Sequence, residues 1–600
     1  MSYKVSSLFP CNPSTTRGVA TKLSASKDKI IYTNGKTVII RDLNNPAIAT
    51  AYSGHTQNAT VARFSPSGYY CASGDASGTV RIWDTVGGDQ TLKAEYKVIS
   101  GRINDLEWDG ESKRIIAVGD GREKFGHAFM MDTGSSVGEI MGHQKPINAV
   151  SIRSQRPYRA VTASDDTTIV FHLGTPYKFD KTIKTHTKFV QDIRYAPSGS
   201  HFASVGSDAK IFIYDGLTGE TAAELTDNGH KGTIMAGNWN SDNKSLVTSS
   251  ADCTVKLWDV ENRKSITTWT LGSGVNHQQV GNIWLGNDTI VSLSMSGDLN
   301  VLDRRSEDKP VRVVTGATKA VTATVPVASD TFLAGTAEGR ILQFSSTTGD
   351  ASYVEGEGHT NLVTSLSVAP DGMVFSVGFD DRLREIEGSK FTSAAASTSS
   401  QPKSVAVAGD GTVFVAEAQN VEAFRSNQKV FETSTKFTPS AIASHGSLVV
   451  IGGEDQKIRL NEWDGKQLRE TANLEGNKGS VTALAFSPNG SLLVAGDSTG
   501  KIVLFDVKEK KVVTSRWSFH SARINSLSWT ADSLHCASGS LDTDVYIWSV
   551  QKPLRNISIK KAVPGGVNAV AWLDSDGKKG QLASAGADGC VRLWDVIFHV

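Results

Sequence analysis

The sequence predicts an all-β protein built from four-stranded units that repeat along the whole chain. A segment of about 40 residues recurs about fourteen times, a period typical of the blades of β-propellers. Its clearest copy ends at 249–260, SSADCTVKLWDV. There Val255 and Leu257 alternate with Lys256, the period-2 pattern of a strand, and Asp252 occupies a tight turn. Two short strands around a turn are therefore the building element.

The ends of the repeat carry a second signal. Gly229-His230 stands about twenty residues before the turn, and Gly54-His55, His186 and His520 precede other copies. A Gly-His start and a Trp-Asp finish resemble the WD-repeat family. The resemblance implies a buried hydrogen-bond network within each blade, because buried polar groups must be paired. In the clearest copy, we expect this structural network to use His230, Ser250, Asp252 and Trp258.

The repeats fall into two series. The first seven units begin at or near Gly18, Gly54, Gly101, His143, His186, Gly229 and Val275. The second seven are centred on TAEGRILQF, VGFDDRLREIEG, QPKSVAVAGDGTVFVAEAQNVEAF, GGEDQKIRLNEW, AGDSTGKIVLFD, SGSLDTDVYIWS and SAGADGCVRLWD.

Seven is the commonest ring size in the WD-repeat family, so the resemblance implies two seven-bladed WD-repeat β-propellers in tandem. We expect an N-terminal propeller over 11–316 and a C-terminal one over 317–600. A closed ring leaves no long unpaired strand edges. Residues 3–9 alternate like a strand before Pro10, and the last unit lacks room for its outer strand. We predict that this strand completes the last blade; closing the first ring is the alternative.

Composition excludes several classes of function. Lys plus Arg and Asp plus Glu number 62 each, so no overall field attracts nucleic acid or anionic lipid. The five cysteines form no Cys-x-x-Cys pair, which predicts a reduced cytosolic protein without structural zinc. No apolar run is long enough for a signal peptide or a membrane span. We expect a cytoplasmic monomer.

No pattern predicts catalysis. The stretch 119–126, GDGREKFG, and the stretch 496–501, GDSTGK, both lack the spacing of a phosphate loop and open no helix. The sequence has no His-Glu-x-x-His segment, and its two Gly-x-Ser-x-Gly stretches, at 134–138 and 496–500, open no helix, so neither is a nucleophile elbow. The sequence therefore predicts a protein that is not an enzyme and uses no cofactor or metal.

The insertion at 119–126 is better explained as a contact surface. It concentrates Arg122, Glu123, Lys124 and Phe125 in a turn longer than blade closure needs. An exposed aromatic among charges is typical of an interface anchor. The alternative is that Phe125 tucks under its own loop.

The fourth unit supplies further candidates. In Asp165-Asp166, the strand register gives Asp166 the structural turn position, so we expect Asp165 to face solvent. Two nearby loops, PYKF at 176–179 and HTKF at 186–189, place phenylalanines where polar residues are usual. Phe179, Phe189 and the neighbouring Lys188 are therefore candidate contacts.

Together, SSLFP, SPSGYYCASGDASGTVRIWD, ESKRIIAVGDGREKFGHAF and HTKFVQDIRY resemble the actin-interacting protein 1 family, WD-repeat cofactors of ADF/cofilin. The resemblance covers essentially the whole chain. It implies binding to cofilin-decorated actin filaments in the actin cytoskeleton and promotion of their disassembly by severing or capping. It also implies that the contacts lie in the N-terminal ring, at positions matching Glu123, Asp165 and Phe179.

Two other classes of function stay open. A general WD-repeat scaffold, such as a ubiquitin-ligase substrate receptor or a trafficking adaptor, is compatible with the fold, because propellers host many functions. Peptide binding at a basic central opening would favour that class. A propeller hydrolase would need inward-facing carboxylates or metal ligands, which the pattern does not supply.

Overall fold

The computed structural model describes residues 2–45, 48–306 and 309–598. In this part of the chain, the strands form fourteen four-stranded sheets, and the only helical element is a 3-10 turn, η1 (Val275–His277). The chain divides into two compact units, one with residues 12–45 and 49–318, the other with residues up to 11 and from 319 onwards. Each unit holds seven sheets, so the predicted all-β fold of two seven-bladed propellers is confirmed.

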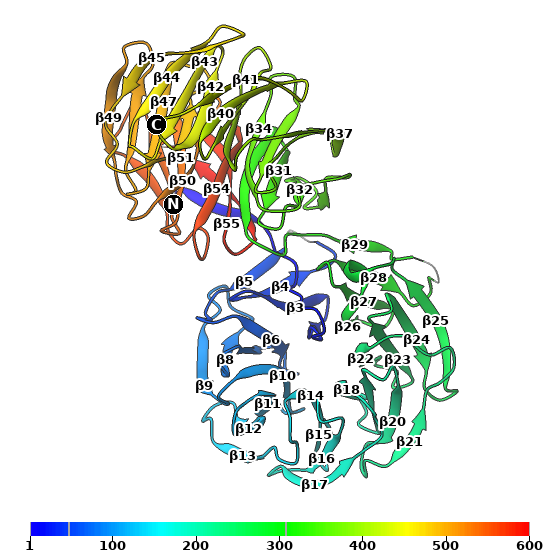
Figure 1. The fold of residues 1–600 in the computed structure, drawn as a ribbon. Helices are drawn as coiled ribbons and strands as arrows, with labels where there is room; N and C mark the ends of the chain where they lie inside the picture. Colours follow the sequence, from blue (N-terminus) through cyan, green and yellow to red (C-terminus); the bar gives the residue numbers. More distant parts are fainter. Residues whose placement is uncertain (1, 46–47, 307–308, 599–600) are drawn as a thin grey trace. The chain divides into compact units, whose positions relative to one another are not determined.

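The N-terminal propeller contains blades 1 to 7 (Figure 1), and their strands are as follows. Blade by blade they are β2 (Ser24–Ser26), β3 (Lys29–Asn34), β4 (Thr37–Asp42), β5 (Ala49–Tyr52); β6 (Ala59–Phe64), β7 (Tyr70–Asp75), β8 (Thr79–Asp84), β9 (Leu92–Lys97); β10 (Arg102–Trp108), β11 (Arg114–Asp120), β12 (Gly126–Met130), β13 (Ser136–Glu139); β14 (Ile147–Ile152), β15 (Arg159–Ser164), β16 (Ile169–Leu173), β17 (Lys178–Ile183); β18 (Val190–Tyr195), β19 (His201–Gly206), β20 (Ile211–Asp215), β21 (Thr221–Glu224); β22 (Ile234–Trp239), β23 (Ser245–Ser250), β24 (Thr254–Asp259), β25 (Lys264–Thr270); β26 (Gln279–Leu285), β27 (Thr289–Ser294), β28 (Leu299–Asp303) and β29 (Arg312–Val314).

The C-terminal propeller contains blades 8 to 14, the last of which includes β1 from the start of the chain. Its strands are β30 (Val321–Ala328), β31 (Thr331–Thr336), β32 (Ile341–Ser345), β33 (Ala351–Tyr353); β34 (Val363–Val368), β35 (Val374–Gly378), β36 (Arg382–Glu387), β37 (Lys390–Ser397); β38 (Pro402–Val407), β39 (Val413–Glu417), β40 (Asn420–Arg425), β41 (Gln428–Ser434); β42 (Pro439–His445), β43 (Leu448–Gly453), β44 (Ile458–Trp463), β45 (Leu468–Leu474); β46 (Val481–Phe486), β47 (Leu492–Asp497), β48 (Ile502–Asp506), β49 (Lys511–Trp517); β50 (Ile524–Trp529), β51 (His535–Ser540), β52 (Val545–Ser549), β53 (Asn556–Ile559); β54 (Val567–Ser575), β55 (Lys579–Gly586), β56 (Val591–Ile597) and β1 (Tyr3–Phe9).

The hydrophobic core consists of layers between neighbouring blades. In β24, Val255 and Leu257 are buried in a layer with Trp284 of the seventh blade. Trp258, on the other face of the same strand, packs in a layer with Val205 of the fifth blade. Because alternate residues of a strand point to opposite faces, one blade fills the space on both of its sides. Each blade is therefore stabilised by its two neighbours.

Each blade of the N-terminal propeller is built from four strands that follow one another in the sequence, and the ring closes where its first blade meets its seventh. The innermost strand of its first blade, β2, packs against β26 of its seventh. Just before β2, the backbone N–H of Thr21 donates to the carbonyl of Val280 at 2.9 Å. The Thr15 hydroxyl donates to the carbonyl of Met295 at 2.7 Å.

The C-terminal propeller closes through both ends of the chain. β1 pairs antiparallel with β56, with Tyr3 opposite Val596 and Phe9 opposite Val591. Its two ends contact different blades: the ring of Tyr3 meets Trp594 edge-on at 6.0 Å, whereas Phe9 meets Phe344 of the first blade of this unit at 5.2 Å. The N-terminal strand therefore joins the last blade to the first.

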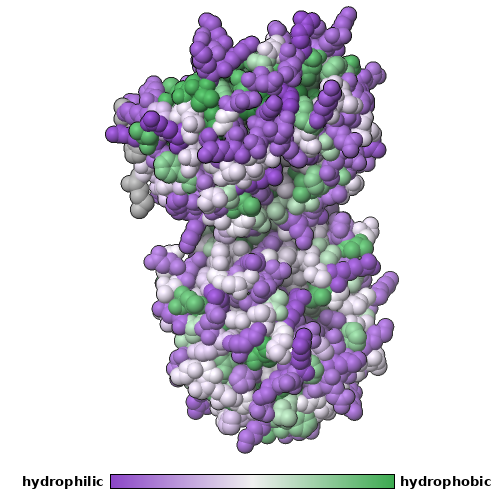
Figure 2. All heavy atoms as spheres, turned by 60° about the vertical axis from the view of Figure 1, so that its left-hand side comes forward, coloured by the Kyte–Doolittle hydropathy of each residue, from purple (hydrophilic) through white to green (hydrophobic). Residues whose placement is uncertain are grey.

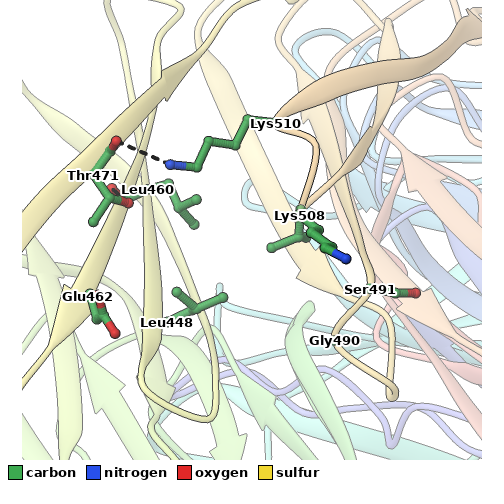
Figure 3. A pocket seen from close by; sticks show the side chains of 9 residues that line it. Leu448, Leu460, Glu462, Thr471, Gly490, Ser491, Lys508 and Lys510 are labelled. Carbon is green, nitrogen blue, oxygen red and sulfur yellow. Dashed lines mark hydrogen bonds between the residues drawn. The ribbon is translucent and has the colours of Figure 1, made fainter.

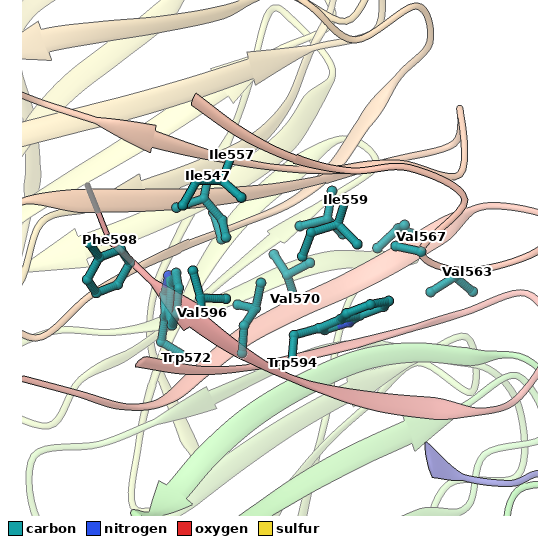
Figure 4. Close-up of a cluster of buried hydrophobic side chains, with 14 residues drawn as sticks. Ile547, Ile557, Ile559, Val563, Val567, Val570, Trp572, Trp594, Val596 and Phe598 are labelled. Atoms are coloured by element: carbon teal, nitrogen blue, oxygen red, sulfur yellow. The ribbon is translucent and has the colours of Figure 1, made fainter. Parts of the chain in front are cut away.

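The layer between the last blade and the one before it consists largely of aliphatic and aromatic side chains. Trp572, Trp594 and Phe598 pack there against Ile547 and Ile557 of the preceding blade (Figure 4). Burying a tryptophan removes ~150–250 Å² from water. This layer fixes the sheet to which β1 is added.

Candidate functional site

Four loops of the third and fourth blades open on the same face of the N-terminal propeller. They are 121–125 between β11 and β12, 140–146 between β13 and β14, 165–168 between β15 and β16, and 184–189 between β17 and β18. Because successive antiparallel strands run in opposite directions, connections alternate between the two faces of a ring. These four occupy alternate connections, so they share a face. We call the four loops, together with Phe179, the loop surface.

Polar contacts within and between blades hold these loops in place. Lys124 Nζ lies 3.5 Å from Glu139 Oε1, at the end of β13. Asn148 Nδ2 donates to Asp165 Oδ1 at 2.7 Å and to the carbonyl of Val190, in the next blade, at 3.0 Å. Asp165 and the 121–125 loop thus lie on the same face of neighbouring blades.

The two neighbouring aspartates differ in role. Asp166 Oδ2 lies 2.9 Å from His143 Nδ1, the blade's structural histidine, as the strand register predicts. Burial alone would raise the pKa of Asp166, but the hydrogen bonds from His143, Thr168 and the backbone N–H of Gln144 together outweigh it and hold that pKa well below its ordinary value. Asp165 is half-buried and oriented by Asn148. Its carboxylate is the one that the blade network does not use.

Two phenylalanines are exposed, as expected for contact residues, although Phe179 lies in β17 and not in a loop as predicted. Phe179 is 48% exposed and Phe189 is 45% exposed. The ring of Phe179 lies over Gly142, where an added Cβ would come within 2.8 Å of ring carbons and where φ is +107°. Lys145 Nζ lies 5.9 Å from the centroid of Phe189. Packing therefore orients both rings while leaving much of each accessible to a partner.

Sequence reasoning missed two residues here. Met141 is 59% exposed beside Gly142, and Lys145 is exposed above Phe189. Both belong to the 140–146 loop, which looked like an ordinary blade connection. The available signal was an exposed methionine next to the Gly-His start of a repeat, because methionine adapts to partner surfaces.

Phe125 is not the fully exposed aromatic that the sequence predicted. Its side chain is half-buried and packs against a cluster that includes Val118 and Ile140. Since the loop is folded back so that the N–H of Gly119 bonds to the carbonyl of Phe125 at 2.7 Å, the ring reaches the core. The charged candidates Arg122, Glu123, Lys124 and Lys188 are exposed.

The hydrogen-bond network of the clearest repeat also needs a correction. His230 Nε2 and Trp258 Nε1 each lie 2.8 Å from Thr248 Oγ1, not from Ser250. His230 Nδ1 bonds to Asp252 at 3.0 Å, as expected. Ser250 instead donates to the carbonyl of Gly232 at 3.2 Å and accepts from the N–H of Asp252. Ser250 ends β23 beside the turn, whereas Thr248 lies one pleat deeper, within reach of the indole.

The innermost strands of the N-terminal propeller hold a buried ion network. Asp105 receives hydrogen bonds from Arg63 at 2.9 Å and Arg194 at 2.8 Å. Asp192 pairs with Lys22 at 2.8 Å and with Arg194 at 3.0 Å. All five groups are buried. These cations are bound to carboxylates, so they do not form the basic opening that a peptide-binding scaffold would use.

A cavity of about 370 Å³ lies between the fourth and fifth blades of the C-terminal propeller (Figure 3). Leu448, Leu460 and Val507 supply its apolar wall, and Glu462, Lys508 and Lys510 surround it.

Among the described residues, no group of three or more His, Cys, Asp or Glu side chains could hold a metal ion. Figure 2 shows that hydrophilic residues cover most of the visible surface.

The repeated His–hydroxyl–Trp–Asp networks within four-stranded blades define a WD-repeat β-propeller protein. Family models agree: the G-beta WD domain model matches residues 47–84, 134–172, 177–215, 222–259 and 557–595. The model of the WD40 domain of anaphase-promoting complex subunit 4 matches residues 442–532.

Comparison with curated proteins narrows the class. Actin-interacting protein 1 of Drosophila melanogaster is 39% identical, covering 99% of this chain and 98% of its own. WD repeat-containing protein 1 of Xenopus tropicalis is 38% identical over the full length of both. The 66 kDa stress protein of Physarum polycephalum is 38% identical over 99% of this chain and 100% of its own. The chain belongs to the actin-interacting protein 1/WD repeat-containing protein 1 family.

The described part of the chain contains no helix with the length and hydrophobicity needed to cross a membrane.

Proposed function

We propose that this protein binds actin filaments decorated with ADF/cofilin through the loop surface and promotes their disassembly. One observation carries the proposal: the exposed rings of Phe179 and Phe189 lie at loops on the same face of the propeller as Asp165 and the exposed Glu123. The name of the Drosophila relative, which covers nearly the whole chain, supports actin as the partner.

The two kinds of side chain have different roles in this proposal. Aromatic rings that are already oriented bury area on binding at little entropic cost, so Phe179 and Phe189 supply affinity. The charges of Glu123, Lys124 and Lys188 set orientation and association rate. The surface is a docking site and performs no covalent chemistry.

Disassembly then follows from differential affinity. A ligand shifts an equilibrium only by the difference in its affinity for two states. Tighter binding to filaments whose geometry cofilin has altered stabilises this altered geometry, and filaments in it are then severed or capped at their ends. The process needs no nucleotide, cofactor or metal. In this proposal the protein acts as a cytoplasmic monomer on cytoskeletal actin.

Co-sedimentation with actin filaments tests the proposal. With cofilin present, we expect more of this protein in the pellet than with bare filaments. We also expect more actin in the supernatant than when the filaments are mixed with cofilin alone or with this protein alone. If cofilin changes neither quantity, the proposal is wrong and a general scaffold role replaces it.

A further inference from the structure

The tenth blade, β38 to β41, contains a pair of glutamates on its two middle strands. Glu417 ends β39, and Glu422 lies in the adjoining strand β40. Both residues are fully buried, at 0% exposure. A carboxylate is almost never buried this completely unless it is paired or protonated.

Hydrogen-bond donors serve only one oxygen of each carboxyl. Glu417 Oε2 accepts from the backbone N–H and the hydroxyl of Ser400, at 2.7 and 2.9 Å. Glu422 Oε1 accepts from Lys429 Nζ at 2.8 Å. The remaining oxygens, Glu417 Oε1 and Glu422 Oε2, are buried and receive no hydrogen bond. Two such oxygens can satisfy each other only when a proton lies between them.

The surrounding charges do not compensate for two ionised carboxylates. Lys429 is shared with Glu432, at 2.9 Å. On the neighbouring strand β38, Lys403 is engaged with Glu454 at 3.0 Å. Three carboxylates therefore surround one available ammonium group, which leaves two negative charges in the cluster if all are ionised. Binding one proton halves that excess and supplies the missing hydrogen bond.

We propose that Glu417 and Glu422 share one proton at neutral pH, and that this proton fastens the 398–401 segment to the tenth blade. Ser400 bonds to Glu417, and Ser399 Oγ lies 2.8 Å from Lys429 Nζ, so both serines of the segment depend on the cluster. Loss of the proton places two charges side by side in a buried site and loosens the segment. The C-terminal propeller thereby responds to pH near neutrality.

The electrostatics give the response its direction. Burial, together with the neighbouring Glu422, raises the pKa of Glu417 to about 8. The folded form thus binds a proton that the unfolded form releases near its ordinary pKa. The stabilisation is complete below that ordinary value and is lost as the pH rises through about 8.

Hydrogen–deuterium exchange of the full-length protein, corrected for the intrinsic pH dependence of exchange, tests this locally. Between pH 6 and pH 8.5, peptides covering 398–422 should lose at least about tenfold protection, since each unit of pKa shift is about a tenfold change in population. Peptides from the N-terminal propeller serve as the internal control. Equal changes in both regions would overturn the proposal.

Glu417→Gln supplies the matched variant, because an amide keeps the shape and cannot ionise. Its 398–422 peptides should exchange at the same corrected rate at both pH values. Exchange that still accelerates at pH 8.5 in this variant would contradict the assignment.

Infrared difference spectroscopy on the wild type covers the case in which the variant does not fold. Ordinary carboxyl groups are ionised throughout pH 6.5 to 9. A protonated carboxyl band present at pH 6.5 and bleached at pH 9 is the expected result, and its absence at pH 6.5 rules out the shared proton.

Discussion

The side chain of Asn568 donates from Nδ2 to the carbonyl of Val321 at 2.8 Å, joining the last blade of the C-terminal propeller to its first. The same bond recurs between consecutive blades, as from Asn525 to the carbonyl of Val567 at 2.8 Å. Ring closure therefore repeats the ordinary contact between neighbours. What distinguishes the closing blade is β1, whose Phe9 reaches across to Phe332 and Phe344.

Removing the Phe9 ring should destabilise the C-terminal propeller. Phe9 is buried, so Phe9→Ala is expected to cost about 3–5 kcal/mol in its free energy of unfolding. Val5, in the same strand, is 46% exposed, and Val5→Ala should change stability by less than about 0.5 kcal/mol. Urea unfolding with exchange detection separates the two propellers. Equal effects of the two variants would show that β1 is not a closing strand.

The corrected network predicts an order of stability. Thr248→Val keeps the shape but removes the hydroxyl that accepts from Trp258 Nε1 and bonds to His230 Nε2, leaving two buried ring nitrogens without a partner. A loss of about 2–4 kcal/mol follows, because each such group costs about 1–3 kcal/mol. Ser250→Ala disturbs only turn contacts and should cost about 1 kcal/mol. If Ser250→Ala lowers the denaturant midpoint more than Thr248→Val does, Ser250 and not Thr248 is the hydroxyl of the network.

Acid should weaken the blades that carry the network. Burial alone would raise the pKa of Asp542, but the hydrogen bonds from His520 and from the backbone N–H groups of Ser521 and Asp544 together outweigh it and lower that pKa to about 2. A depressed folded-state pKa gives stability that is present above the ordinary value and lost as the pH falls toward 2. Thermal unfolding from pH 5 to 2.5 should show a smaller decline in Asp542→Asn than in wild type. Glu475→Gln, at an exposed position, is the control and should decline as wild type does.

Gly142 should affect binding through the position of the Phe179 ring. A Cβ at this position meets the ring of Phe179 at 2.8 Å, so Gly142→Ala displaces the ring. We expect several-fold weaker binding to cofilin-decorated filaments. Gly286→Ala, where φ is also positive but no atom lies within 4 Å, controls for backbone strain. If both variants bind equally well, the orientation of Phe179 is not important.

The repeat period was enough to predict four-stranded β units, because strand alternation and turn residues are local properties of each unit. The division into two rings of seven came from the resemblance to the WD-repeat family. The choice between Thr248 and Ser250 was not local: both hydroxyls lie on the same face of β23, two residues apart, and only the position of the Trp258 indole separates them. Spacing alone favoured the wrong one.

The loop surface was only partly predictable. Phe179 and Phe189 stood out as aromatics in loops, and both are exposed. Phe125 looked similar in sequence, yet it packs inward because its loop folds back onto β11. Asp105 and Arg194 are 89 residues apart and come from different blades, so no sequence window could reveal their pairing. Such contacts depend on the assembled ring.

The central claim is that the loop surface contacts cofilin-decorated actin. The most direct test compares the affinities of Phe179→Ala and Leu217→Ala for such filaments. Leu217 is 44% exposed in the connection between β20 and β21, which opens on the opposite face. We predict at least about tenfold weaker binding for Phe179→Ala, with wild-type melting, and no change for Leu217→Ala. Wild-type affinity in Phe179→Ala, or an equal loss in Leu217→Ala, would contradict the account.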